Sequence, residues 1–219
     1  MSLNFEQARA AMIEQQVRPW DVLDPRVLEA LLHVHREDFV PPAHRQLAFA
    51  DLQLPLAHGE FMLKPVVEGR LLQALALAPT DRVLEIGTGS GFLTACLASL
   101  CGEVVSVDLH ADFTAAAGER LRAAGIRNAS LATGDAVREW QPDGLFDAIV
   151  VGGAVFTVPP RFFSWLKPGG RLLAMRGQSP AQQAVLLSRQ GTAELREESL
   201  FETDLPYLLH AEPPQHFVF

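Results

Sequence analysis

The chain has 219 residues, of which 48% are hydrophobic and 20% charged, a composition typical of one folded domain or of one domain with a small extension. Eighteen Lys and Arg against 26 Asp and Glu give a net charge of −8, which argues against a nucleic-acid partner held through phosphate contacts. The two cysteines, Cys96 and Cys101, are too few for a disulfide framework and lack neighbours for a zinc site. With no apolar run of the roughly 18 residues that a membrane span needs and no signal-peptide pattern, we expect a cytoplasmic protein without a membrane partner.

Residues 1–79 form the first of two predicted parts of the chain, a helical extension interrupted by prolines. Two N-cap residues open its first helices: Asn4, with Gln7 completing a capping box, and Asp24, which precedes Pro25. The first helix is expected to end before the Arg-Pro pair at residues 18 and 19. An irregular loop is expected over residues 52–65, followed by a helix over about 65–78.

Residues 80–219 alternate strand and helix, and we assign them to a second, ligand-binding unit. Apolar strands are expected at residues 82–86, 103–108, 129–132, 146–151 and 171–175. Strands that alternate with helices pair in parallel through right-handed crossovers. Two further strands flank Gln190-Gly191 and predict an antiparallel hairpin at one edge. The expected fold class is therefore α/β: a doubly wound, mostly parallel, seven-stranded Rossmann-like sheet with an N-terminal helical extension.

A glycine-rich turn follows the first expected strand, at residues 87–91, Gly-Thr-Gly-Ser-Gly. Ligands of such sheets bind beyond the carboxyl ends of the strands, where glycines let the backbone approach closely and the next helix offers free N–H groups. The spacing is G-x-G-x-G, whereas the usual dinucleotide pattern would need glycine where Phe92 stands.

Three acidic residues are expected around this turn. Asp108 closes the second strand, where a carboxylate accepts two hydrogen bonds from a ribose diol or is simply a surface acid. Asp135, after Gly134, is placed to accept from an adenine amine, and it also suits an N-cap of the turn that begins near Ala136, a role that does not exclude binding. Glu85, at the end of the first strand, meets either an ammonium group or the N–H groups of the loop. Together these features favour S-adenosylmethionine over a dinucleotide.

The segment from residue 82 to 108 resembles the cofactor motifs of class I methyltransferases, and the chain as a whole resembles the protein-L-isoaspartate O-methyltransferase family over most of residues 5–176. The supporting segments are residues 12–19, 36–42, 54–56, 146–150 and 166–172. The resemblance implies S-adenosyl-L-methionine as cofactor and methyl transfer to the α-carboxylate of isoaspartyl residues in damaged protein. The residues expected to bind the cofactor are Glu85, Gly87, Thr88, Gly89, Gly91, Asp108, Leu109, Gly134 and Asp135.

The expected substrate loop departs from the family pattern G-Q-T-I-S-Q-P. This chain has Gly-Glu-Phe-Met-Leu-Lys-Pro at residues 59–65, so Phe61 and Leu63 replace the two hydroxyl residues. Because Leu63 donates no hydrogen bond to a carboxylate, transfer should be slower by about 5- to 150-fold. We assign the acceptor site to Leu63, His58 and Lys64, whose ammonium attracts a carboxylate. The alternative is that His58 and Lys64 are ordinary loop and helix-start residues.

Other functions therefore stay open: a methyltransferase for a different or less polar acceptor, or a non-catalytic S-adenosylmethionine-binding protein. Two more segments depart from the family, residues 151–155 and 200–207. Thr88 either binds the cofactor carboxylate or only stabilises its loop. The histidines other than His58, including His110 and His210, are too dispersed in the sequence to nominate a catalytic pair, and no metal site is expected.

Overall fold

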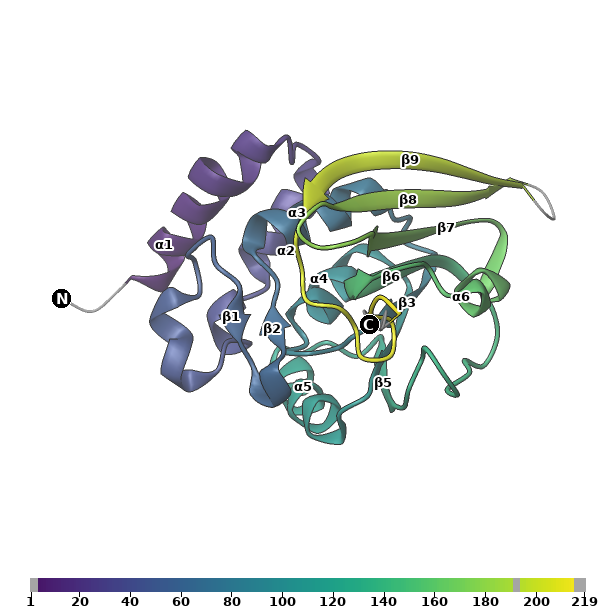
Figure 1. The fold of residues 1–219 in the computed structure, drawn as a ribbon. Coiled ribbons are helices and arrows are strands. Elements are labelled where there is room, and N and C mark those ends of the chain that lie inside the picture. Colours follow the sequence, from purple (N-terminus) through teal and green to yellow (C-terminus); the bar gives the residue numbers. More distant parts are fainter. Residues whose placement is uncertain (1–3, 191–193, 215–219) are drawn as a thin grey trace, which may run out of the picture.

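A seven-stranded sheet lies at the centre of the protein (Figure 1), a computed structural model that describes residues 4–190 and 194–214. The strand order is β5-β4-β3-β6-β7-β8-β9, parallel from β5 to β7 and antiparallel from β7 to β9. The strands are β3 (Arg82–Ile86), β4 (Glu103–Asp108), β5 (Ala129–Thr133), β6 (Phe146–Val155), β7 (Leu166–Arg176), β8 (Gln182–Gln190) and β9 (Glu194–Thr203). The predicted fold class is confirmed, while the second residue of the predicted Gln190-Gly191 turn lies outside the described residues.

Helices pack on both faces of this sheet. The crossover helices are α4 (Phe92–Leu100), α5 (Ala111–Ala123) and α6 (Pro160–Ser164). The helical extension contributes α1 (Phe5–Met12), a π-helical turn (Ile13–Val17), α2 (Pro25–His33) and α3 (Pro65–Leu75). In Figure 1 the extension lies beside α4, and α2 and α3 contact α4 directly. Asn4 and Asp24 cap α1 and α2 through their side-chain oxygens, as the sequence predicted.

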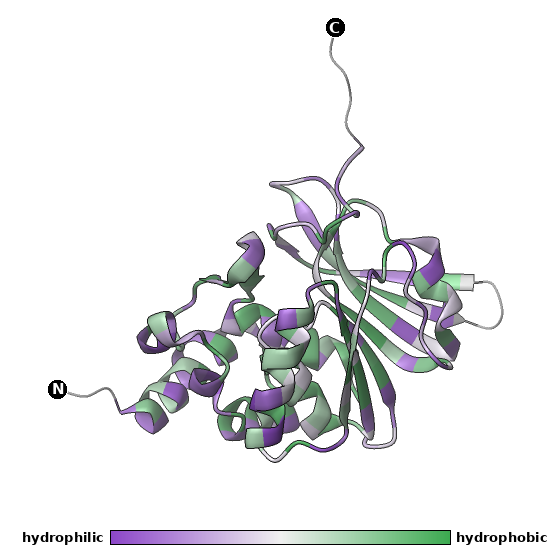
Figure 2. Cartoon of the chain, turned by 90° about the horizontal axis from the view of Figure 1, so that it is seen from below, coloured by the Kyte–Doolittle hydropathy of each residue, from purple (hydrophilic) through white to green (hydrophobic). Residues whose placement is uncertain are grey.

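Alternate residues of the central strands point to opposite faces, which creates two cores. Val83 packs in the core that the sheet shares with the helical extension, and Leu84 packs in the second core with Phe162 of α6. A strand buried on both faces has a nearly continuous apolar sequence, and β3 follows this rule after its first residue with Val83, Leu84 and Ile86, interrupted by the buried Glu85. Figure 2 shows the same contrast, with green central strands and purple segments on the surrounding helices.

The predicted irregular loop at residues 52–65 is wrong in part. It contains a two-stranded hairpin, β1 (Leu54–Pro55) and β2 (Phe61–Met62), around a 3₁₀ turn (Ala57–Gly59). We call residues 54–62 the acceptor hairpin. The pairs are too short to show an alternating pattern, so the sequence contained no strand signal here.

Other boundaries differ from the prediction by a few residues. Helix α3 ends at Leu75 because Ala76 adopts a left-handed conformation with φ 45°. Strand β6 continues beyond Val151 as far as Val155, because its last residues still pair with the end of β7. The glycines at 152 and 153, which the sequence placed after the strand, therefore lie within it.

Candidate cofactor and acceptor site

The glycine turn joins β3 to α4 and has backbone conformations that favour glycine. Gly87 and Gly91 have φ 96° and 86°. A Cβ on Gly91 would also lie 2.9 Å from the Cβ of Ala117, so α5 packs directly on the turn. The turn therefore needs glycine both for its backbone shape and for its contact with the neighbouring helix.

Asp108 is held in one orientation by backbone donors on two sides. Its Oδ2 accepts from the N–H of Gly89 at 2.8 Å, and its Oδ1 accepts from the N–H of His110 at 2.9 Å. The N–H of Gly134 donates to the carbonyl of Asp108 at 2.8 Å, which ties the loop after β5 to the same strand end. A carboxylate oxygen accepts more than one hydrogen bond, so both oxygens keep capacity for a ligand.

A pocket opens where the strand order reverses, between the ends of β3 and β6. Of the residues predicted to bind the cofactor, those that line it are Gly87, Gly89, Asp108, Leu109, Gly134 and Asp135. The backbones on its two sides approach closely, since a Cβ on Gly152 would lie 2.8 Å from the carbonyl oxygen of Gly87. Glycine backbone without side chains, next to a carboxylate held in one orientation, leaves room for an adenosine with an amino-acid tail.

The other three predicted cofactor residues do not line the pocket. Gly91 packs on α5, and the Thr88 hydroxyl bonds the hydroxyl of Ser106 at 2.6 Å, which is the loop-stabilising role. Glu85 is fully buried and accepts a hydrogen bond from Thr94 of α4. Burial raises the pKa of Glu85 to about 8, against the smaller opposing effect of the Ser106 and Thr94 hydroxyls. Its carboxyl group is therefore mostly protonated at neutral pH. It lies in the protein interior beside the glycine turn, not in the pocket.

Asp135 caps the turn after Gly134, a role that the sequence left compatible with ligand binding. Its Oδ1 accepts from the N–H groups of Val137 and Arg138 at 2.9 and 3.0 Å. Its Oδ2 lies 2.6 Å from Nδ1 of His210, a contact that the sequence did not predict. Asp135 thus links the loop after β5, which lines the pocket, to His210 near the C-terminal end of the described chain.

Residues 204–211, which we call the C-terminal strap, cross the pocket and form one of its walls. Ala154 of β6 donates to the carbonyl of Pro206 at 2.9 Å and accepts from the N–H of Leu208 at 2.8 Å. The Tyr207 hydroxyl donates to the carbonyl of Gly177 and accepts from the N–H of Ser179, both at 2.9 Å. The strap residues that line the pocket are Leu205, Pro206, Tyr207, Leu208 and Leu209. Sequence reasoning missed this wall, because only its apolar composition marks it.

The acceptor hairpin forms the opposite wall, and the structure separates the three predicted acceptor residues. Leu63 lines the pocket, while its carbonyl accepts from Nη2 of Arg36 at 2.6 Å. Lys64 lies outside the lining and has no ion-pair partner within residues 4–190 and 194–214. His58 is also outside the lining and lies 2.9 Å from Asp112, at the rim.

Two further residues of this wall are charged or aromatic. Phe61 lines the pocket and remains 42% exposed. Glu60 also lines it, and burial raises the pKa of its carboxyl group, with His110 and His58 opposing the shift and Asp108 adding to it. The sequence-based expectation covered only pairs among the other histidines, and it did not predict that the rings of His58 and His110 stack with centroids 4.0 Å apart. The fold joins loops that are far apart in the sequence.

A doubly wound sheet with a glycine turn after its first strand, and an acid at the end of the next, is shared by class I methyltransferases and dinucleotide-binding proteins, and comparison with known proteins identifies the first class here. Residues 7–205 match the family described as protein-L-isoaspartate(D-aspartate) O-methyltransferase. The chain belongs to this family and is an S-adenosylmethionine-dependent methyltransferase.

Two related proteins that carry this family's name support the family assignment. The protein-L-isoaspartate O-methyltransferase of Koribacter versatilis is 37% identical over 196 residues, which cover 90% of this chain and 88% of that one. That of Myxococcus xanthus is 42% identical over 165 residues, or 75% and 78% of the two chains. The family match ends at Leu205, so most of the strap lies beyond it.

Solved structures share the fold. A protein-L-isoaspartate O-methyltransferase structure aligns with TM-score 0.78 and 25% identity over 91% of this chain and 65% of that one. A Plasmodium falciparum structure of the same description, in complex with S-adenosyl-L-homocysteine, aligns with TM-score 0.77 and 19% identity over 94% and 99%.

No helix in the described ranges is long and apolar enough to cross a membrane.

Proposed function

We propose that this protein transfers a methyl group from S-adenosylmethionine to the α-carboxylate of isoaspartyl residues in proteins or peptides. The family match over residues 7–205, together with a pocket built around Asp108, carries the proposal. The two cysteines, Cys96 and Cys101, are free thiols, which suits the cytoplasm that we propose as its compartment.

The cofactor, when bound, supplies a methyl group made electrophilic by a sulfonium. Asp108 would accept from the ribose hydroxyls, and the backbone of the turn at residues 87–91 would lie against the amino-acid tail. Leu109 would offer an apolar surface to the base, since it lines the pocket and is 38% exposed. Leu208 of the strap contacts the same region, because its Cδ2 would lie 3.6 Å from a Cβ on Gly87.

The acceptor needs alignment rather than a base. A carboxylate is already ionised at neutral pH, so the chain has only to hold its oxygen in line with the methyl group and to exclude water. The acceptor hairpin and the strap, on opposite sides of the pocket, are the elements that would exclude water. Leu63 contributes no hydrogen bond from its side chain, and its carbonyl is already bonded by Arg36.

The test is transfer of a labelled methyl group to an isoaspartyl peptide, with the same peptide containing ordinary aspartate as control. We expect label only in the isoaspartyl peptide, while calorimetry shows binding of S-adenosylhomocysteine. A protein that binds S-adenosylhomocysteine but labels neither peptide contradicts the proposed acceptor without contradicting the cofactor.

The variant Leu63→Ser sharpens this test. It restores a hydroxyl at the pocket wall, so kcat/KM for the isoaspartyl peptide should rise by about 5- to 150-fold. The affinity for S-adenosylhomocysteine should stay unchanged. Leu63→Ala is the matched control, because it removes the same bulk without adding a donor, and its rate should not rise equally.

A second acceptor class is favoured by one observation. Leu56, Phe61 and Leu63 all line the acceptor side of the pocket, so this wall offers an apolar surface beside the carboxyl group of Glu60. We propose, as the alternative, an acceptor whose reacting group has an apolar flank. Faster methylation of an isoaspartyl peptide with apolar neighbours than of one with polar neighbours, at equal concentration, would favour it.

A further inference from the structure

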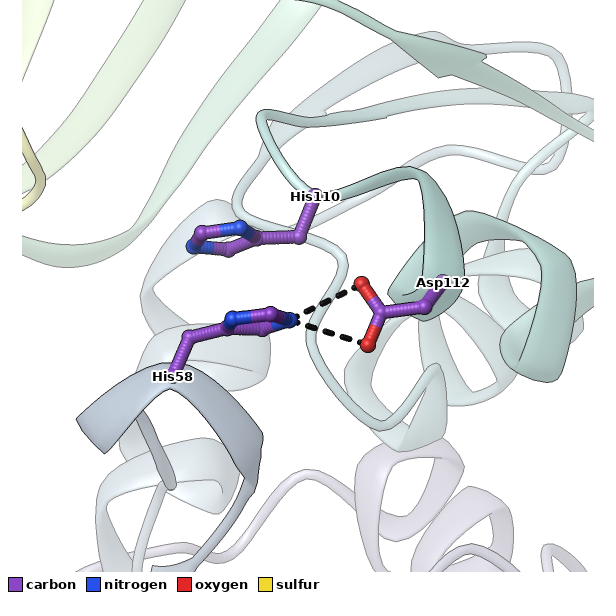
Figure 3. Close-up of side chains that lie close together, drawn as sticks. All are labelled: His58, His110 and Asp112. Carbon is purple, nitrogen blue, oxygen red and sulfur yellow. Dashed lines mark hydrogen bonds and ion pairs between the residues drawn. The ribbon is translucent and has the colours of Figure 1, made fainter.

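Three side chains that ligate metal ions meet at the rim of the pocket (Figure 3). His58 comes from the 3₁₀ turn of the acceptor hairpin, whereas His110 and Asp112 come from the start of α5. One ligand atom from each lies within 4.8 Å of the others, and no other group of this kind occurs in the described part of the chain. The fold brings together positions that are more than fifty residues apart in the sequence.

The three side chains are near one another but are not yet arranged as ligands of one ion. Both oxygens of Asp112 lie within 3.0 Å of Nε2 of His58, and the ring of His110 lies parallel to that of His58, with an interplanar angle of 6°. With metal–ligand bonds of 2.0–2.1 Å, neighbouring ligands of a tetrahedral zinc ion are about 3.3 Å apart. Because an imidazole ligates a metal in its own ring plane, binding would require the His58 ring to turn out of its stack on His110, and the side chains of His58 and Asp112, 41% and 59% exposed, have room to turn.

An ion pair between His58 and Asp112 does not by itself explain the second histidine. The His110 side chain makes no hydrogen bond within the described ranges, and Figure 3 shows that its Nδ1 lies on the side of Asp112 while its buried Nε2 points away, so Nδ1 is the nitrogen that would ligate. The hydrogen bonds of the group therefore leave ligand capacity unused.

We propose that His58, His110 and Asp112 bind a divalent transition-metal ion, with zinc as the best match to two imidazoles and one carboxylate. Three protein ligands leave the fourth position for water. The ion would join the acceptor hairpin to the loop that follows Asp108. This inference rests on the cluster alone and stands whether or not the isoaspartyl acceptor is correct.

A metal ion bound at this cluster would affect one wall of the pocket. Glu60 and Phe61, which follow His58 in the hairpin, line the pocket, as does His110 itself. An ion that fixes the hairpin against α5 would lower the mobility of that wall. If metal raises the affinity for S-adenosylhomocysteine by some factor, the cofactor product must raise the affinity for metal by the same factor.

The experiment uses the full chain without a histidine tag. Zinc binding is measured by calorimetry, and cobalt binding by the visible absorbance that four-coordinate cobalt gives. We expect one ion per chain. His58→Ala and Asp112→Asn should each weaken binding by at least about 10-fold, because each removes a direct ligand.

A matched control is His35→Ala. His35 and Asp38 form another exposed pair, with Nδ1 and Oδ2 3.7 Å apart, but it lacks a second histidine. This variant should bind zinc as the unmodified protein does. Zinc should also raise the Tm of the unmodified protein but not that of His58→Ala, whose folding is checked by circular dichroism.

Three results would overturn the proposal. The first is the lack of saturable binding of one zinc ion per chain up to about 1 mM, an affinity too weak for a built site. The second is undiminished zinc affinity in folded His58→Ala and Asp112→Asn. The third is a loss in His35→Ala as large as the loss in His58→Ala.

Discussion

The cofactor side and the acceptor side of the pocket are built in different ways. On the cofactor side, Asp108 is fixed by N–H groups of Gly89 and His110, so short bonds between adjacent loops define the site. On the acceptor side, the carbonyl of Leu63 is held by Arg36, which is fully buried and reaches it from the helical extension. The comparison shows that the cofactor side is fixed by backbone hydrogen bonds between neighbouring strand-end loops, whereas the acceptor side is fixed by a buried side chain from the helical extension.

The largest expected effect tests the acceptor side. Arg36 donates to the carbonyls of Ala48 and Leu63 and pairs with Glu68, which is also buried. Arg36→Met leaves the Glu68 carboxylate buried without its counter-charge, so the free energy of unfolding should fall by about 3–5 kcal/mol. Urea denaturation measures this. The double variant Arg36→Met with Glu68→Leu should recover much of the loss, and a single-variant loss below about 1 kcal/mol would contradict the comparison.

The next largest expected effect is a pH dependence of stability that arises from Glu85, at the end of β3 before the glycine turn. The folded-state pKa of Glu85, about 8, exceeds its ordinary value of 4.5, so the folded protein binds this proton more tightly than the unfolded chain. The stabilisation is complete below about pH 4.5 and is lost as the pH rises through 8.

Between pH 6 and 8 the free energy of unfolding should therefore fall by about 2–3 kcal/mol from this group. Glu85→Gln stays neutral at every pH, so its stability should change less over the same interval. Urea denaturation of both proteins at the two pH values makes the comparison. Equal pH dependence in the two proteins would show that Glu85 is ionised in the fold.

A smaller effect is expected at the pocket surface. Asp108→Asn keeps the shape of the side chain but removes the charge that two backbone donors bind and that we propose accepts from the ribose. We expect the affinity for S-adenosylhomocysteine to fall by about 10- to 100-fold in calorimetry. Asp143→Asn, at an exposed acid away from the pocket, is the control and should leave the affinity unchanged. A similar loss in both variants would point to net charge rather than to the site.

The smallest effect concerns the strap. Tyr207→Phe removes two hydrogen bonds, to Gly177 and from Ser179, without changing the apolar ring. The free energy of unfolding should fall by about 1 kcal/mol, and the affinity for S-adenosylhomocysteine should fall by a few-fold. Reduced stability with an unchanged affinity would show that these two strap hydrogen bonds do not contribute to cofactor binding.

The cofactor side was largely predictable from the sequence because its features are local. The glycine spacing at residues 87–91 and the acids that end β4 and follow β5 lie where the strand pattern placed them. The sequence left the direction of the Thr88 hydroxyl and the burial of Glu85 open. Both depend on α4 and β4 packing around them, which no local pattern encodes.

The acceptor side was less predictable for a physical reason. Leu63 is at the pocket, as expected, but the partner of its carbonyl, Arg36, is 27 residues away in the sequence. His58 and His110 stack only because the acceptor hairpin packs on the start of α5. The strap was missed because its hydrogen bonds join Ala154 to residues more than fifty positions further along the chain.

The strap also determines at what point in the synthesis of the chain the pocket can be completed. The glycine turn and Asp108 lie in the middle of the chain, whereas the wall that completes the pocket is made by residues 204–211. A nascent polypeptide therefore carries the cofactor loops long before its last wall has left the ribosomal tunnel. Full-affinity binding of the cofactor must wait until that segment has emerged, so translation that stops before Leu205 yields a sheet with an open site.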